Sequence, residues 1–120
     1  MIEMCKEMKR LRELLDQHNI AWEDCSTIQS EEVIEKLMKN SSIKKREFYD
    51  TTIYRTFFAF NNKTWSAING FGTYGGFSPH EKINYGLLEV WDGEHDTEGW
   101  LTANEVLELT GIVDETDKQG

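Results

Sequence analysis

Residues 51–70, TTIYRTFFAFNNKTWSAING, decide the fold. Residues 51–60 are rich in β-branched and aromatic side chains, which is typical of a β-strand. Residues 64–70 predict the return strand, with Trp65 and Ala67 on one face and Ser66 and Ile68 on the other. Asn61-Asn62-Lys63 lies between them and predicts a turn, because asparagine tolerates a positive φ. The stretch therefore predicts an antiparallel β-hairpin.

The segment before the hairpin predicts two helices. Apolar side chains recur along residues 2–18 in steps of four and three, which is the period of an amphipathic α-helix. Ser30 is a good N-cap residue, and acidic side chains follow it where the helix dipole favours them. A second helix is therefore expected over residues 31–40.

The segment after the hairpin predicts a third strand over residues 85–91, an acidic loop over 92–99 and a helix over 103–110. Thr102 and Glu105 have the spacing of a capping box, which marks the start of that helix. Consecutive strands with short connections favour an antiparallel sheet. We therefore predict one α+β domain spanning the chain, with N-terminal helices and a C-terminal helix packed on a small antiparallel sheet.

The length of the chain and the distribution of its charge limit the classes of function that it suits. The chain has 120 residues, which suits one domain, and a formal net charge of −9. Residues 1–80 hold 11 acidic and 11 basic side chains, whereas residues 81–120 hold 11 acidic and 2 basic ones. This distribution weighs against nucleic-acid binding, which needs a basic surface. A small anion remains compatible with the basic residues of the first part.

The sequence also indicates in which cellular compartment the protein is expected. No run approaches 18 apolar residues, so no membrane-spanning helix is expected. The beginning, MIEMCKEMKRLREL, is charged throughout and lacks the apolar centre of a signal peptide. We expect a cytoplasmic protein, with no membrane contact and with its two cysteines reduced.

The glycine-rich segment GFGTYGGFSPH, residues 70–80, is the first candidate for binding. Glycines let a backbone approach a ligand and can turn N–H groups towards phosphate. The aromatic residues Phe71, Tyr74 and Phe77 are interleaved with them and suit stacking on a base. The segment matches neither the P-loop nor a GxGxxG fingerprint. The alternative is a loop or bulge whose glycines only meet backbone demands.

Arg55 is the second candidate. It stands in mid-strand, in IYRTFF, where a charged side chain must be exposed, paired or bound to a ligand. A guanidinium suits phosphate or carboxylate. The alternative is an arginine on a solvated strand face, or one paired with an acid from residues 81–120. The four tryptophans are expected mostly in the core, with one or two lining a pocket or an interface.

Signals for catalysis and metal binding are weak. His18, His80 and His95 are far apart, and no GxSxG or HExxH motif occurs. Cys5 and Cys25 lack the spacing of metal ligands, and the loop DGEHDTE lacks that of an EF-hand. We expect no catalytic residue, metal or cofactor, and so no enzyme.

Four runs together resemble a family: MKRLRELLDQHNIAWEDCS, IYRTFFAFNNKTWSAINGFGTYGGFS, GLLEVW and GWLTANEVLEL. They are similar to the bacteriophage anti-Thoeris proteins that act as nucleotide sponges. The resemblance implies a viral anti-defence protein in the host cytoplasm. It also implies sequestration, without turnover, of a cyclic ADP-ribose isomer made by TIR-domain enzymes. Homo-oligomers with ligand pockets between protomers are implied as well.

Under this resemblance Arg55 pairs with a pyrophosphate oxygen, glycines approach the ligand, and an aromatic side chain stacks on the adenine. The candidate residues are Arg55, Trp65, Gly70, Phe71, Gly72, Tyr74 and Gly75. A second hypothesis is an acidic inhibitor of a protein, of the anti-CRISPR or DNA-mimic type, acting through residues 81–120. A small enzyme, such as a cyclic-nucleotide phosphodiesterase, has the least support.

Overall fold

The computed structural model describes residues 2–40 and 50–112. The elements follow one another as α1 (Lys6–Gln17), β1 (Trp22–Asp24), α2 (Glu31–Asn40), β2 (Ile53–Phe60), β3 (Lys63–Gly70), β4 (Phe77–Ser78), β5 (Ile83–Asn84), β6 (Leu88–Trp91), β7 (Glu98–Leu101) and α3 (Ala103–Thr110).

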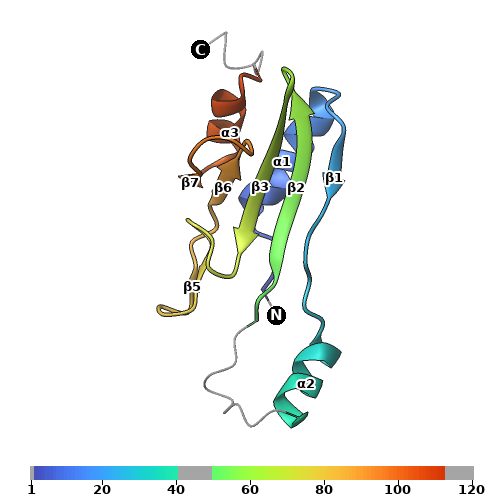
Figure 1. Cartoon of the computed structure of the whole chain (residues 1–120), viewed down its shortest axis with the longest axis vertical. Helices are drawn as coiled ribbons and strands as arrows, with labels where there is room; N and C mark the ends of the chain where they lie inside the picture. The colour runs from blue at the N-terminus through green and yellow to red at the C-terminus, as the bar shows by residue number, and fades with distance from the viewer. Residues whose placement is uncertain (1, 41–49, 113–120) are drawn as a thin grey trace.

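The strands form a five-stranded antiparallel sheet in the order β1-β2-β3-β6-β7, and β4 pairs with β5 in a separate small hairpin (Figure 1). The predicted central hairpin is confirmed, with its register running from Ile53 opposite Gly70 to Phe60 opposite Lys63. Asn61 and Asn62 form the turn with φ angles of 55° and 64°. Lys63, predicted as a turn residue, belongs to β3.

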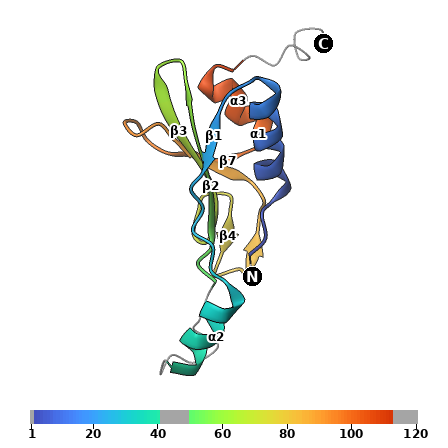
Figure 2. The same cartoon turned by 90° about the vertical axis from the view of Figure 1, so that its right-hand side faces the viewer.

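The core lies between one face of the sheet and the helices α1 and α3, which Figure 2 shows on the same side. The apolar stripe of α1 is buried there, as are side chains on the inner faces of β2, β3 and β6. Its fully buried members include Met8, Leu11, Leu14, Leu15, Ala67, Leu88 and Val106. The predicted α+β class is thus confirmed. Helix α2 departs from the predicted packing, because it lies beyond the end of the sheet, away from α1 and α3 (Figures 1 and 2).

The ends of the terminal helices follow from local chemistry. The Thr102 side chain accepts the Glu105 N–H at 3.2 Å, and the Glu105 carboxylate accepts the Thr102 N–H at 3.0 Å. This confirms the predicted capping box and the start of α3. Helix α1 begins at Lys6 and not at residue 2, because Ile2 has other partners. Its N–H donates to Asp50 at 2.6 Å, and its carbonyl accepts the Tyr54 hydroxyl at 2.9 Å.

The segment after the hairpin differs most from prediction. The strand expected over 85–91 is shorter, since Gly86 has a φ of 72° and regular pairing begins only at Leu88. The loop predicted for 92–99 ends early, because β7 begins at Glu98 and pairs with β6. β4, β5 and β7 were not predicted.

Among the described residues, no helix combines the length and the apolar character needed to cross a membrane.

Candidate functional site

The sheet has one face that neither α1 nor α3 covers, which we call the open face (Figure 2). Strand alternation and register place on it a row of apolar side chains with a few charged ones between them. Its residues are Glu23, Ile53, Arg55, Phe57, Ala59, Thr64, Ser66, Ile68, Glu89 and Trp91. Phe57 is 36% exposed and Trp91 is 48% exposed, so this face carries large apolar groups in contact with solvent.

Arg55 lies in the middle of the open face. Its backbone is fully used, because its N–H donates to the Ser26 hydroxyl at 2.9 Å and its carbonyl accepts the Cys25 N–H at 3.0 Å. Its side chain is half-buried opposite Ile68, and its Nε is buried with no hydrogen-bond partner among the described residues. A buried guanidinium N–H without an acceptor is costly, so Arg55 is placed to gain from a bound anion.

The glycine-rich segment forms a loop that hydrogen bonds fix in place. The Leu87 N–H donates to the Gly75 carbonyl at 2.8 Å, and the Tyr85 N–H donates to the Gly76 carbonyl at 3.1 Å. The Tyr74 N–H donates to the Glu89 carboxylate at 2.8 Å. The loop is therefore tied both to the segment leading into β6 and to a side chain of β6 itself.

The glycines of this loop have different roles. A Cβ at Gly70 would lie 2.3 Å from the Thr52 carbonyl oxygen, and one at Gly75 would lie 2.9 Å from the Leu87 Cβ. Close packing therefore requires glycine at both positions. This agrees with the alternative interpretation of the segment, in which the glycines only meet the demands of the backbone. Gly72 differs, since nothing lies within 4 Å of a Cβ placed there. Only its φ of +71°, which is in the left-handed region, favours glycine at this position.

A pocket of about 270 Å³ opens beside this loop. We call it the glycine–aromatic pocket. The residues that matter in its lining are Gly72, Tyr74, Gly75, Glu81, Tyr85 and Trp100. Tyr74 is 61% exposed, Tyr85 40% and Trp100 53%, and the rings of Tyr85 and Trp100 meet edge to face with centroids 5.1 Å apart. Three large aromatic side chains thus remain open to solvent around one hollow.

Trp100 reaches this pocket because β7 is irregular. The register of β7 against β6 shifts between Leu88 and Val90, and Trp100 has a φ of 60°. A bulge re-aims side chains, and a left-handed conformation is costly for a bulky residue. The Trp100 N–H donates to the Tyr74 carbonyl at 3.2 Å, which fixes β7 against the glycine-rich loop.

Two sets of side-chain hydrogen bonds involve the segment from Glu81 to Leu87, which borders the pocket. Asn69 is fully buried, and its amide donates to the Leu87 carbonyl at 2.8 Å and to the Asn84 side chain at 3.2 Å. At the rim, the Tyr85 hydroxyl donates to the Glu81 carboxylate. This hydrogen bond raises the pKa of Tyr85 above its ordinary value, because losing the proton would set two negative groups against each other.

The pocket brings together three of the predicted site residues, Gly72, Tyr74 and Gly75. The others lie elsewhere. Trp65 is 7% exposed and belongs to the core, and Phe71 packs against the core half-buried. Gly70 ends β3, and Arg55 lies on the open face.

Sequence reasoning missed Glu81, Tyr85 and Trp100. Trp100 was noted only as one of four tryptophans, and Tyr85 only as part of a strand. Glu81 directly follows the glycine-rich segment, so its place in the chain could have indicated it. No local spacing joins Tyr85 and Trp100 to the loop, since their approach depends on the bend at Gly86 and on the pairing of β6 with β7.

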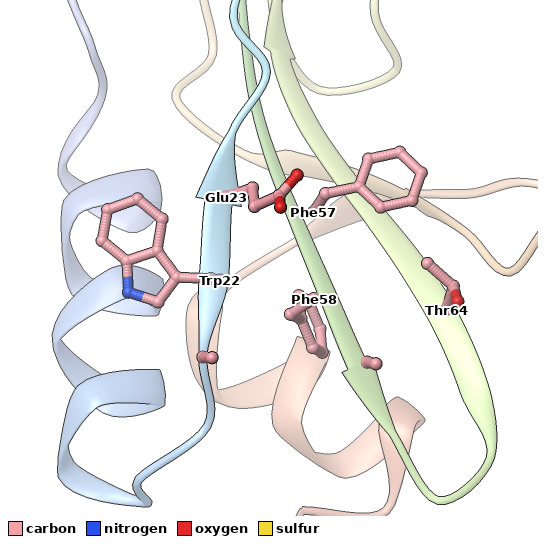
Figure 3. A pocket seen from close by; sticks show the side chains of 7 residues that line it. Trp22, Glu23, Phe57, Phe58 and Thr64 are labelled. Carbon is pink, nitrogen blue, oxygen red and sulfur yellow. The ribbon is translucent and has the colours of Figure 1, made fainter.

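A second hollow, of about 310 Å³, lies between β1 and the central hairpin. Figure 3 shows Trp22 directed towards α1, while Glu23 and Phe57 lie on the opposite side of the strands. Arg12 of α1 stacks on the Trp22 ring at 4.6 Å and donates to the Thr56 hydroxyl at 2.7 Å. These contacts fasten both the edge strand β1 and its neighbour β2 to α1, and none of the predicted site residues lines this hollow.

The acidic loop between β6 and β7 folds on itself. The Asp92 carboxylate accepts the N–H groups of Glu94 and His95 at 2.9 and 2.8 Å and contacts the His95 ring at 2.6 Å. These hydrogen bonds hold the pKa of Asp92 well below its usual range. Within the described ranges 2–40 and 50–112, no group of three or more His, Cys, Asp or Glu side chains is arranged to hold a metal.

The chemistry available in the glycine–aromatic pocket is therefore stacking on aromatic rings and hydrogen bonding to a carboxylate, on a loop that backbone bonds hold in place. No protein-family model, curated protein or solved structure matches the chain, so its function is inferred from this geometry.

Proposed function

We propose that the protein binds a small nucleotide-derived signalling molecule, of the cyclic ADP-ribose isomer class, and holds it without turnover. It would act as a phage counter-defence protein that sequesters the signal of TIR-based immunity. The observation that carries this proposal is the glycine–aromatic pocket, where Tyr74, Tyr85 and Trp100 stay exposed around a hollow of about 270 Å³.

Stacking supplies the affinity in this proposal. A base stacked on an aromatic side chain contributes about 1–3 kcal/mol. The loop that carries Tyr74 is fixed by backbone bonds to residues 85 and 87 and by the Glu89 carboxylate. Binding therefore costs little further ordering of the loop, which favours affinity.

The phosphates need a cation, and the described lining of the pocket contains none. Arg55 is the candidate, because its buried Nε has no acceptor in the part of the chain that the structure describes, but it lies on the open face and not in the pocket. We therefore propose a homo-oligomer in which protomers pair so that Arg55 of one completes the pocket of another. The exposed Phe57 and Trp91 give the open face the apolar character of a protein interface.

Calorimetry with cyclic ADP-ribose isomers tests the proposal. The unmodified protein should bind, mass spectrometry should recover the ligand unchanged, and sedimentation should show an oligomer. Trp100→Ala should weaken binding about tenfold or more, because one stacking contact is lost. Arg55→Ala should weaken it through loss of the phosphate contact. Leu109→Ala, on the outer side of α3 and 37% exposed, is the control and should bind normally.

The proposal fails if the folded protein gives no heat with these ligands at tens of micromolar. It also fails if both Trp100→Ala and Arg55→Ala bind as tightly as the unmodified chain.

The acidic loop favours a second candidate, an inhibitor that occupies the basic surface of a protein. In Figure 2 the loop between β6 and β7 projects to the side away from α1 and α3. Trp91 is fastened beneath it, with its indole N–H donating to the His95 carbonyl at 2.7 Å. An acidic rim next to exposed Trp91 suits a basic partner.

Pull-down from a bacterial lysate separates the two candidates. The inhibitor hypothesis predicts a stoichiometric protein partner that is released at high salt, because screening weakens charge attraction. It also predicts that replacing Glu94 and Asp96 with glutamine and asparagine reduces capture. If the same partner is held at high salt, or by the charge-reduced variant, the acidic loop is not the binding surface.

A further inference from the structure

The described lining of the glycine–aromatic pocket carries negative charge without a compensating positive charge. Glu81 is the charged side chain in its described lining, and no Lys, Arg or His accompanies it there. The faces of the surrounding aromatic rings carry the negative end of a quadrupole. Both the carboxylate and the ring faces attract positive charge and repel phosphate.

Glu81 is held where it acts on the pocket. The Tyr85 hydroxyl donates to one of its carboxylate oxygens, and the Glu81 N–H donates to the Ser78 hydroxyl at 3.3 Å. His80 and Lys82 are its neighbours in the chain, yet both are exposed and neither lines the pocket. The positive charge of Lys82 therefore does not enter the hollow to cancel that of Glu81.

A second carboxylate lies behind the loop. Glu89 accepts the Tyr74 N–H at 2.8 Å, and it sits opposite Ile68 in the register of the sheet. Tyr74 thus binds one acidic side chain, Glu89, through its backbone N–H and lines the same hollow as a second one, Glu81.

We propose that this pocket selects a positively charged heteroaromatic ring, such as a pyridinium or an N-alkylated purine, over a neutral ring of the same shape. The inference rests on the proposed function, since it names the part of the nucleotide that enters the pocket. The anionic part of the ligand is then directed away from Glu81 and towards Arg55. Cation–π contact with partly exposed rings, together with the carboxylate, predicts a preference of about fivefold or more.

Matched rings test the preference without the rest of the nucleotide. We would titrate the full chain with 1-methylnicotinamide, which is a permanent cation, and with 6-methylnicotinamide, which is neutral and of similar size. Chemical shifts of the Trp100 indole and the Tyr74 amide report binding in the pocket. The charged ring should bind at least about fivefold more tightly.

Two charge-matched variants locate the cause. Glu81→Gln keeps the size of the side chain and should reduce the preference by at least half, whereas Glu94→Gln removes the same charge from the acidic loop and should leave it unchanged. Both residues are exposed, so both variants are expected to fold.

Equal binding of the two rings overturns the inference, and so does an undiminished preference in Glu81→Gln or no binding of the charged ring. Such a result leaves the proposed function standing if cyclic ADP-ribose isomers still bind and Trp100→Ala still weakens them. The proposed function fails separately if those isomers do not bind at all.

Discussion

Gly70→Ala is expected to destabilise the protein by about 3 kcal/mol, as overpacking against an unyielding neighbour does. The new Cβ would lie 2.3 Å from the Thr52 carbonyl oxygen and 2.6 Å from the Ile53 Cα. Both are backbone atoms at the beginning of β2, where Thr52 directly precedes the strand and Ile53 is its first residue, so no side-chain rotation relieves the contact. The free energy of unfolding in urea, taken from the midpoint and slope, measures the effect.

Gly70 also anchors the loop that follows it. Its N–H donates to the Thr73 hydroxyl at 3.1 Å, and its carbonyl accepts that hydroxyl at 3.0 Å. A shift of the backbone at Gly70 would therefore move the loop that carries Tyr74. The substitution should weaken ligand binding only together with stability.

Gly72→Ala is the matched control. A Cβ there meets nothing within 4 Å, so only the left-handed φ of +71° opposes the change. That conformation costs roughly 1–2 kcal/mol for a residue with a side chain. Gly72→Ala should thus be clearly less damaging than Gly70→Ala. A Gly70→Ala protein as stable as the unmodified chain, but unable to bind, would show that Gly70 serves the ligand and not the packing.

The parts of the fold that were predictable are those set by neighbouring residues. The hairpin of β2 and β3 follows from strand alternation and from Asn61 and Asn62, and α3 follows from the capping box of Thr102. The first two residues of β7, Glu98 and Gly99, fall within the predicted loop, because the segment Glu98–Leu101 has no strand alternation of its own. They are extended because they pair with β6, which is a contact between distant segments.

The site was predictable only in part, for the same reason. Glycine and aromatic composition pointed to the loop of Gly72 and Tyr74, and the structure places both at a pocket. Trp100 enters that pocket through a shifted register and a positive φ, neither of which leaves a signal in local sequence. Arg55 was singled out correctly as an unusual charge in a strand, but its separation from the loop depends on the register of β2 and β3.

Trp65→Ala is expected to cost about 3–5 kcal/mol of stability, the range for removing a large aromatic side chain from a core. Trp65 is 7% exposed and lies opposite Phe58, which is 3% exposed, on the helix-facing side of the sheet. A domain is typically stable by about 5–15 kcal/mol, so this one change would remove a large share. Thermal and urea unfolding followed by circular dichroism measure the loss.

Trp65→Phe separates packing from hydrogen bonding. The Trp65 Nε1 is buried and has no hydrogen-bond partner among the described residues, so phenylalanine gives up ring volume but no hydrogen bond. The smaller ring should therefore restore most of the stability lost in Trp65→Ala. A ligand-stacking role predicts the reverse pattern, in which Trp65→Ala folds normally and affinity falls.

Trp91→Ala supplies the matched tryptophan on the other face of the same sheet. Trp91 is 48% exposed, and its substitution gives up one hydrogen bond to the His95 carbonyl, worth about 1 kcal/mol. Because β3 and β6 present Trp65 inward and Trp91 outward, the two substitutions compare the core with the open face at constant chemistry. A large loss of stability in Trp65→Ala and a small one in Trp91→Ala would mean that the open face contributes little to the stability of the fold. Its exposed apolar side chains would then be available to contact a binding partner.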